Sequence, residues 1–183
     1  MGALIAFEVA RAIRRKGRPG PTRLFVSAAK APHLKRTGPP RSTLPDAEFR
    51  AMLCDMGGTP AAVLQEQELL AMFLPGLRGD FAEYDGDAYR PEPPLDCPVS
   101  VYGGLHDREV DHGHLEAWSD HTTRRITIRM FAGGHFFVRT AARQVAQAVL
   151  EDFQAREEHT TEDSPFLRLR RVAAWPTAAR ARP

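Results

Sequence analysis

Two polar residues have types and positions suited to acid–base chemistry. Asp107 follows the strand-like residues 98–102, and His135 comes 28 residues later, after the alternating residues 125–131 and the pair Gly133-Gly134. Each side chain should lie where a strand ends, and open α/β sheets build their sites at that edge. A carboxylate can hold an imidazole in the tautomer that acts as a general base. We therefore interpret Asp107 and His135 as catalytic candidates that still need a nucleophile.

No residue of the chain is a convincing nucleophile. Ser27 ends a predicted strand at residues 23–28, but it lacks the flanking glycines of a nucleophile elbow. We interpret Ser27 as a packing residue. Cys97 precedes its strand and should lie at the opposite edge of the sheet, and we expect both Cys54 and Cys97 to be free thiols.

A group of residues around Asp107 could also suggest a metal site. Zinc sites usually take their ligands from two rigid elements at tighter spacing, and no second group of ligands stands out here. We therefore expect no metal and no cofactor. The residues of this group are His106, Asp107, Asp111, His112 and His114.

The composition is that of an ordinary globular domain. Of 183 residues, 43% are hydrophobic and 26% are charged, and the formal net charge is +2. Residues 155–183 contain six arginines and four acidic residues, so the rest of the chain is close to neutral. This balance argues against a nucleic-acid-binding protein. Without a signal peptide or an apolar run that could cross a membrane, we expect a cytoplasmic protein.

Alternating strands and helices predict a parallel sheet with right-handed crossovers. A helix is expected at residues 3–15, and residues 45–84 form a helical region with a kink or break at Pro75. We expect Thr140 to cap a last helix whose apolar face includes Leu150 and Phe153. The predicted division is core at residues 1–40, a helical lid at 41–95, core again at 96–154, and a disordered tail at 155–183.

Several separated motifs occur along the chain in a fixed order, beginning with Met1-Gly2-Ala3 and ending with the glycine pair before His135. In this order they resemble motifs of the type II thioesterases of polyketide and nonribosomal peptide synthetases. The nucleophile elbow of that family reads Gly-His-Ser-Met-Gly-Ala, and its last three positions match Met1-Gly2-Ala3. The resemblance covers about residues 1–154. The other matching motifs are Leu24-Phe25-Val26-Ser27, Ala31-Pro32-His33, Gly57-Gly58-Thr59-Pro60, Leu77-Arg78-Gly79-Asp80-Phe81, Leu95-Asp96-Cys97-Pro98, residues 103–107 and Gly133-Gly134-His135-Phe136.

The resemblance implies an α/β fold, namely the C-terminal part of an α/β-hydrolase parallel sheet with an inserted helical lid. It implies that Asp107 is the triad acid, that His135 is the triad base and that the backbone N–H of Met1 contributes to the oxyanion hole. The serine nucleophile would directly precede Met1. We expect a misplaced start codon or a truncated gene to explain why the sequence does not contain it. We therefore expect these 183 residues alone to be nearly inert.

The implied activity is hydrolysis of acyl thioesters on the phosphopantetheine of an acyl or peptidyl carrier protein. This hydrolysis removes stalled or wrong acyl groups from the synthetase, which is called editing. Two alternatives stay open: a non-catalytic remnant that binds a carrier protein, and a generic serine esterase of the same fold. For the intact enzyme we expect a monomer. In that family the strand before the elbow pairs with the strand that corresponds to residues 23–28. Without this partner we expect an unpaired strand edge and an aggregation-prone (sticky) product.

Overall fold

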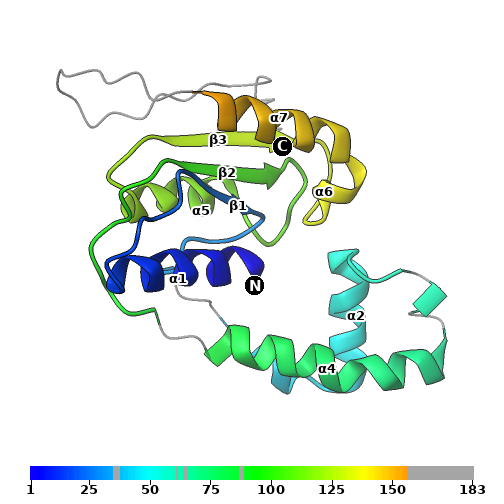
Figure 1. The fold of residues 1–183 in the computed structure, drawn as a ribbon. Coiled ribbons are helices and arrows are strands. Elements are labelled where there is room, and N and C mark those ends of the chain that lie inside the picture. The colour runs from blue at the N-terminus through cyan, green and yellow to red at the C-terminus, as the bar shows by residue number, and fades with distance from the viewer. Residues whose placement is uncertain (35–37, 61, 64–65, 87–88, 156–183) are drawn as a thin grey trace, which may run out of the picture.

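Three parallel strands form the centre of the protein. In the computed structural model they are β1 (Leu24–Ser27), β2 (Val99–Gly104) and β3 (Ile126–Phe131), in the order β1-β2-β3, with Val26 opposite Val101 and Val101 opposite Ile128. All three arrowheads point the same way in Figure 1. The predicted strands and their parallel pairing are therefore confirmed. The structure describes residues 1–34, 38–60, 62–63, 66–86 and 89–155.

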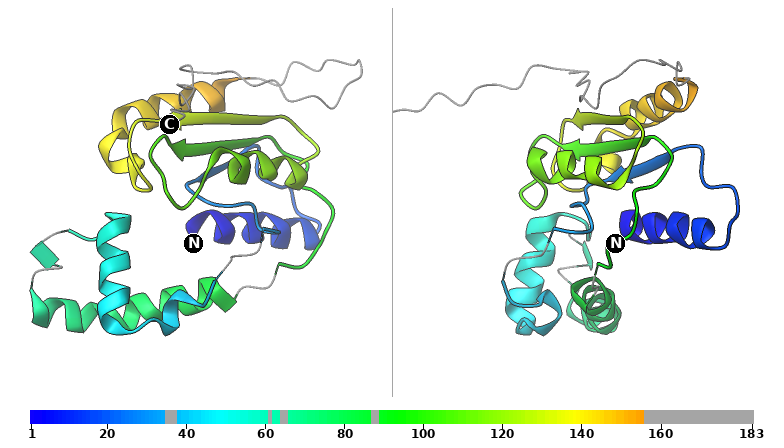
Figure 2. Two further views of the ribbon diagram at one scale, coloured as in Figure 1. Left: turned by 180° about the vertical axis from the view of Figure 1, so that it is seen from behind. Right: turned by 90° about the vertical axis from the view of Figure 1, so that its left-hand side faces the viewer.

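Helices cover both faces of this sheet, as Figure 2 shows. Helix α1 (Gly2–Arg15), α5 (His112–Glu116) and the short helix η2 (Ala117–His121) pack on one face. Helix α7 (Ala142–Gln154) packs on the other. Alternate strand residues point to opposite faces, so Val99 and Val101 are buried with α1, while Tyr102 is buried with α7. The start of α1 lies at the same edge as the carboxyl ends of the strands.

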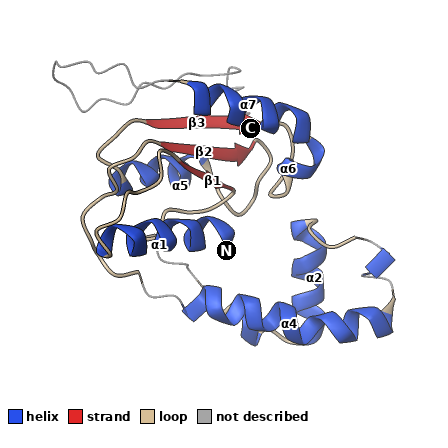
Figure 3. Ribbon diagram, in the orientation of Figure 1, coloured by secondary structure: helices blue, strands red, loops and turns tan. Residues whose placement is uncertain are grey.

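A second group of helices lies beyond this edge of the sheet (Figure 3). We call η1 (Arg41–Thr43), α2 (Asp46–Met56) and α4 (Gln67–Gly86) the helical insertion. It has an apolar core of its own, which contains Phe49, Leu53, Leu70 and Leu74. The helical character predicted for residues 45–84 is confirmed, whereas the division of the chain into domains remains a prediction.

Of the kink or break expected at Pro75, the break is absent, because α4 continues through this residue. The kink remains a prediction. Proline removes one backbone hydrogen bond and disfavours a helix interior. Here Leu70 and Leu74 before it are buried, and Leu77 and Phe81 after it pack against the same core. Packing on both sides of Pro75 therefore keeps the helix continuous.

The start and the apolar face of α7 also differ from the prediction. Thr140 ends α6 (Phe137–Thr140), and its hydroxyl donates to the carbonyl of Phe137 at 3.3 Å instead of capping α7. Leu150 and Phe153 are 56% and 66% exposed. The side that meets the sheet carries Asp152, whose hydrogen bonds to sheet residues orient the helix.

Trp118 of η2 is fully buried and donates from Nε1 to the carbonyl of Ala29 at 2.9 Å. Cys54 and Cys97 are both free thiols. Among the described residues, no helix is long and apolar enough to span a membrane. The tail predicted to be disordered lies, from residue 156 onward, outside the described residues.

Candidate active site

Two glycine-containing turns meet at the carboxyl ends of β2 and β3. The carbonyl of Gly133 accepts a hydrogen bond from the His106 backbone N–H at 2.9 Å. Gly133 has a φ of 129°, which residues with a Cβ rarely adopt. A Cβ on Gly104 would come within 2.3 Å of the Gly134 carbonyl oxygen. The absence of side chains at these glycines therefore allows the loops that carry Asp107 and His135 to come together.

The predicted acid and base are in direct contact. Nδ1 of His135 lies 2.9 Å from Oδ2 of Asp107, and the side chains are 21% and 0% exposed. A carboxylate can only accept, so this contact requires a proton on Nδ1 and leaves the lone pair on Nε2. The other oxygen of Asp107, Oδ1, accepts from the backbone N–H groups of Glu109 and Val110 at 2.8 and 3.2 Å. The carboxylate is thus fixed on both sides.

This environment keeps Asp107 ionised. Burial alone raises the pKa of Asp107, but the hydrogen bond and charge of His135 and the backbone N–H groups of Glu109 and Val110 outweigh it. The resulting pKa of Asp107 is lower than that of an ordinary aspartate. A buried carboxylate that stays charged can stabilise the imidazolium formed when His135 accepts a proton.

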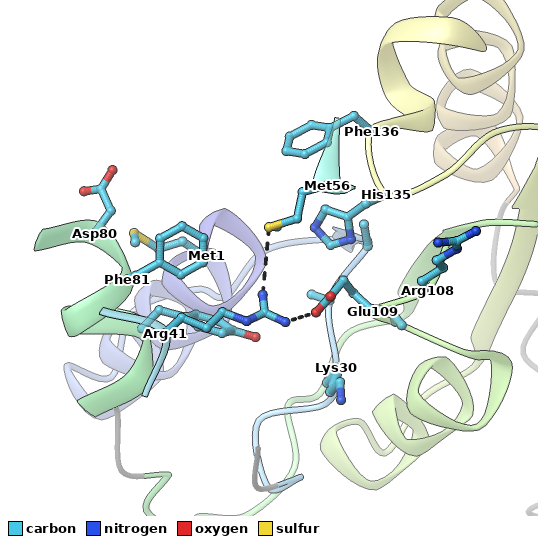
Figure 4. A pocket seen from close by; sticks show the side chains of 14 residues that line it. Met1, Lys30, Arg41, Met56, Asp80, Phe81, Arg108, Glu109, His135 and Phe136 are labelled. Carbon is cyan, nitrogen blue, oxygen red and sulfur yellow. Dashed lines mark hydrogen bonds and ion pairs between the residues drawn. The ribbon is translucent and has the colours of Figure 1, made fainter. Parts of the chain in front are cut away.

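His135 borders a pocket of about 420 Å³ between the sheet edge and the helical insertion (Figure 4). Met1 also lines this pocket, and burial lowers the pKa of its α-amino group. The predicted oxyanion-hole residue and the predicted base therefore face one cavity. The remaining lining residues are Ala28, Ala29, Lys30, Arg41, Met56, Asp80, Phe81, Tyr84, Arg108, Glu109, Val110 and Phe136.

The rejected nucleophile candidates lie elsewhere. Ser27 ends β1 and does not contribute to the described pocket lining, and Cys97 is buried just before β2. The described lining contains neither serine nor cysteine. Among the described residues that line the pocket with His135, none is therefore a serine or cysteine that could act as the nucleophile.

The group of histidines and aspartates near Asp107 has structural partners. Asp111 caps α5: its Oδ1 accepts from the His114 N–H, and its own N–H donates to Nδ1 of His114. Nδ1 of His112 lies 3.3 Å from Oε1 of Glu116. Within the described part of the chain, no three such side chains are arranged to hold a metal ion.

Sequence reasoning missed the residues that connect the helical insertion to the acid–base pair. The guanidinium of Arg41 pairs with the carboxylate of Glu109. The ring of Phe136 lies so close to Gly58 that a Cβ there would come within 2.3 Å of it. Glu109 follows Asp107 by two residues, and Phe136 directly follows His135. Their residue types did not indicate that Arg41 and Gly58, which are distant in sequence, would be their partners.

Comparison with known proteins shows the family of the chain. Residues 1–156 match the sequence model of the thioesterase domain. The chain belongs to the thioesterase family. Among curated relatives, the gramicidin S biosynthesis protein GrsT of Aneurinibacillus migulanus is 41% identical over 138 residues, which is 75% of this chain and 54% of GrsT.

Solved thioesterases have the same fold. RedJ, a thioesterase from the prodiginine biosynthetic pathway in Streptomyces coelicolor, superposes with a TM-score of 0.75 at 35% identity, covering 82% of this chain and 60% of RedJ. The type II thioesterase BorB from the borrelidin biosynthetic cluster gives 0.72 at 37% identity, with coverages of 81% and 60%. The chain thus spans 54–60% of the lengths of these relatives. The family resemblance and the α/β fold inferred from the sequence are confirmed.

Proposed function

We propose that this thioesterase chain supplies the acid and the base of a Ser-His-Asp triad that hydrolyses acyl thioesters. The observation that carries the proposal is the 2.9 Å contact between His135 Nδ1 and Asp107 Oδ2 on the wall of the pocket. This contact leaves Nε2 as the acceptor for a proton from a hydroxyl nucleophile.

The proposed reaction has two steps. A serine hydroxyl attacks the thioester carbonyl while Nε2 of His135 takes its proton. The C–S bond then breaks, and the imidazolium returns the proton to the leaving thiolate. In the second step His135 takes a proton from water while the water oxygen attacks the carbonyl carbon of the acyl-serine. The bond between this carbon and the serine oxygen then breaks, the imidazolium returns the proton to the serine oxygen, and the free carboxylic acid is released. Asp107 remains ionised throughout and stabilises each imidazolium.

A residue placed directly before Met1 would lie at the pocket, because Met1 itself lines it. We propose that a serine in this position provides the nucleophile, and that the amide N–H of Met1 then helps to bind the oxyanion. An N–H at the start of α1 (Gly2–Arg15) is well suited to this role, since the N-terminal end of a helix carries partial positive charge.

The proposed substrate is an acyl group on the phosphopantetheine of an acyl or peptidyl carrier protein. Support comes from relatives whose names place them in gramicidin S, prodiginine and borrelidin biosynthesis. We propose editing of such an assembly line as the biological role. We propose that the intact enzyme is a monomer in the cytoplasm, a compartment that fits the two free thiols, Cys54 and Cys97.

The test compares this chain preceded by Gly-His-Ser with the same chain preceded by Gly-His-Ala. We expect the serine form to release acyl groups from a carrier protein and to be labelled by a fluorophosphonate, and the alanine form to do neither. If both forms are equally active, or if a folded serine form is neither labelled nor active, the proposed triad is wrong. Faster hydrolysis of a p-nitrophenyl ester than of the carrier thioester would instead indicate a generic esterase.

A second candidate function is non-catalytic binding of an acylated carrier protein. The observation that favours it is the described pocket lining, which contains neither serine nor cysteine. Isothermal titration of the unaltered chain with a carrier protein separates the two functions. Tight binding without turnover by either the unaltered or the serine-bearing chain would support the binding function.

A further inference from the structure

The Arg41–Glu109 ion pair joins the helical insertion to the loop of the catalytic candidate Asp107. Arg41 belongs to η1, which packs on α4, and its guanidinium reaches Glu109 across the pocket (Figure 4). The same guanidinium lies 3.9 Å from the sulfur of Met56 and 5.9 Å from the ring centroid of Phe81. Arg41 therefore contacts both helices of the insertion and one residue of the core.

Glu109 also makes a direct contact with the triad acid. Its backbone N–H donates to Oδ1 of Asp107 at 2.8 Å, while Oδ2 of Asp107 holds His135. The side chain and the backbone of one residue thus connect Arg41 to the carboxylate that orients the base. A displacement of Glu109 must change the hydrogen bond on Oδ1, and through it the orientation of the carboxylate plane.

The ion pair is partly shielded from solvent. The side chains of Arg41 and Glu109 are 19% and 32% exposed. Exposed ion pairs are weak because water and salt screen them, and a partly buried pair loses less to screening. Arg41 is also held by Met56 and Phe81, so less side-chain entropy is lost when it binds Glu109.

We propose that Glu109 is a positioning residue, and that the Arg41–Glu109 ion pair makes the orientation of Asp107 depend on the placement of the helical insertion. This inference rests on the proposed function of Asp107 and His135. It predicts that the imidazole is correctly oriented only while the insertion is seated over the pocket.

The test first uses the unliganded chain and does not need catalysis. The Nδ1 proton of His135 is followed by NMR, and the exchange of the Glu109 and Val110 amide protons is measured. In Arg41→Gln and Glu109→Gln we expect the Nδ1 signal to shift or broaden, and exchange of both amides to be about fivefold faster, because the loop loses a fixed contact. Arg41→Lys keeps the charge, so its Nδ1 signal and its amide exchange rates should stay close to those of the unaltered chain.

Arg78→Gln is the matched control. Arg78 also holds the helical insertion together, through the Ser42 carbonyl at 2.7 Å, Asp46 at 2.6 Å and the ring of Phe49. None of these contacts reaches the Asp107 loop. The Arg41→Glu/Glu109→Arg double variant, which reverses the pair, should behave more like the unaltered chain than either single variant does.

Kinetics give an independent measurement in the serine-bearing chain. We expect Arg41→Gln and Glu109→Gln to lower kcat about tenfold with a smaller change in KM, since the base is misoriented more than binding is weakened. An unchanged Nδ1 signal and unchanged amide exchange in both variants, or equal changes in Arg78→Gln, would overturn the inference. If the serine-bearing chain is inactive, the proposed function fails, while the NMR and exchange measurements still decide this inference.

Discussion

At the residue scale, the site depends on a carboxylate that is buried yet charged. The side chain of Asp107 is fully buried, and three donors keep it ionised: His135 and the backbone N–H groups of Glu109 and Val110. Removing a carboxylate from water is costly unless such donors replace the water. The arrangement favours a single tautomer of His135, which is the one that leaves Nε2 free to act as a base.

Asp107→Asn should remove this control of the tautomer. An asparagine can donate to Nδ1 and thereby favour the wrong tautomer, so we expect kcat of the serine-bearing chain to fall by roughly 10³–10⁴. In the unliganded chain the Nδ1 proton signal of His135 should disappear from the NMR spectrum. Asp111→Asn is the control, because asparagine caps a helix as well as aspartate does. Activity within about tenfold of the unaltered site would contradict the proposed role of Asp107.

A second buried group makes the stability depend on pH. His121 is 4% exposed, and its Nε2 lies 2.7 Å from Nδ1 of His33. Burial, together with the charges of His33 and Arg11, lowers the pKa of His121 to about 4, although Asp120 opposes this. In the unfolded chain its pKa is about 6.5, so only the unfolded state takes up a proton between these values. The free energy of unfolding should therefore fall as pH drops from 6.5 to 4.

His121→Gln tests this dependence. Glutamine cannot take up the proton, so we expect a smaller loss of stability between pH 6.5 and pH 4 than in the unaltered chain. Urea unfolding at several pH values measures the slope. His112→Gln, which replaces a partly exposed histidine outside this cluster, is measured for comparison. Equal slopes for His121→Gln and the unaltered chain would show that His121 does not cause the acid sensitivity.

At the scale of elements, the loops that carry Asp107 and His135 are positioned by backbone contacts that tolerate no side chain at Gly104. The turn after β3 lies against the last residue of β2, so the Gly133 and Gly134 carbonyls occupy the space that a Cβ on Gly104 would need. These neighbours are backbone atoms and cannot move aside as a flexible side chain could. The distance between Asp107 and His135 is therefore set by the pairing of these two turns.

Gly104→Ala should separate the turns. We expect a loss of about 2–4 kcal/mol in the free energy of unfolding, with loss of the His135 Nδ1 proton signal even where the chain still folds. Urea unfolding and NMR measure the two effects. Gly79→Ala in α4 is the control, because a Cβ there meets nothing within 4 Å. A stable Gly104→Ala chain with an unchanged Nδ1 signal would contradict this explanation of the site.

Helix α7 is held to the sheet by a buried polar cluster. Asp152 accepts from the Tyr102 hydroxyl at 2.8 Å and from Arg129 at 2.5 Å. Asp152→Ala would leave the hydroxyl and the guanidinium without this partner, and we expect a loss of about 3 kcal/mol in urea unfolding. Glu151→Ala removes the more exposed partner of Arg129 and should cost less than about 1 kcal/mol. Similar losses in both variants would show that Asp152 has no special role.

At the scale of the whole molecule, the pocket lies between the sheet and the helical insertion, which have separate apolar clusters. Two clusters cover the two faces of the sheet, and a third lies inside the helical insertion. The part of the sheet that the structure describes ends at β1, which pairs only with β2. On α1, Ile5 and Val9 are 55% and 52% exposed on one side of the helix. The open strand edge and this apolar surface are both features that promote association.

We therefore expect the isolated chain to self-associate as its concentration rises. Ile5→Glu/Val9→Lys should reduce this association, because it replaces the apolar surface with a favourable ion pair along the helix. Sedimentation velocity over a range of concentrations measures the effect. The same change at Leu150 and Phe153 of α7 is the control for general solubility. A monomer at every concentration, with a sharp cooperative melt, would contradict this prediction and the sticky product expected from the sequence.

The sequence by itself determined the three strands, the first helix and the positions of Asp107 and His135 after two glycine-containing turns. These features follow from local patterns, since alternation, helical periodicity and glycine pairs act over a few residues. Only the tertiary structure decided that α4 continues through Pro75, that α7 turns Asp152 toward the sheet, and that Arg41 meets Glu109, 68 residues away. Each depends on packing or pairing between distant segments, which local periodicity does not encode.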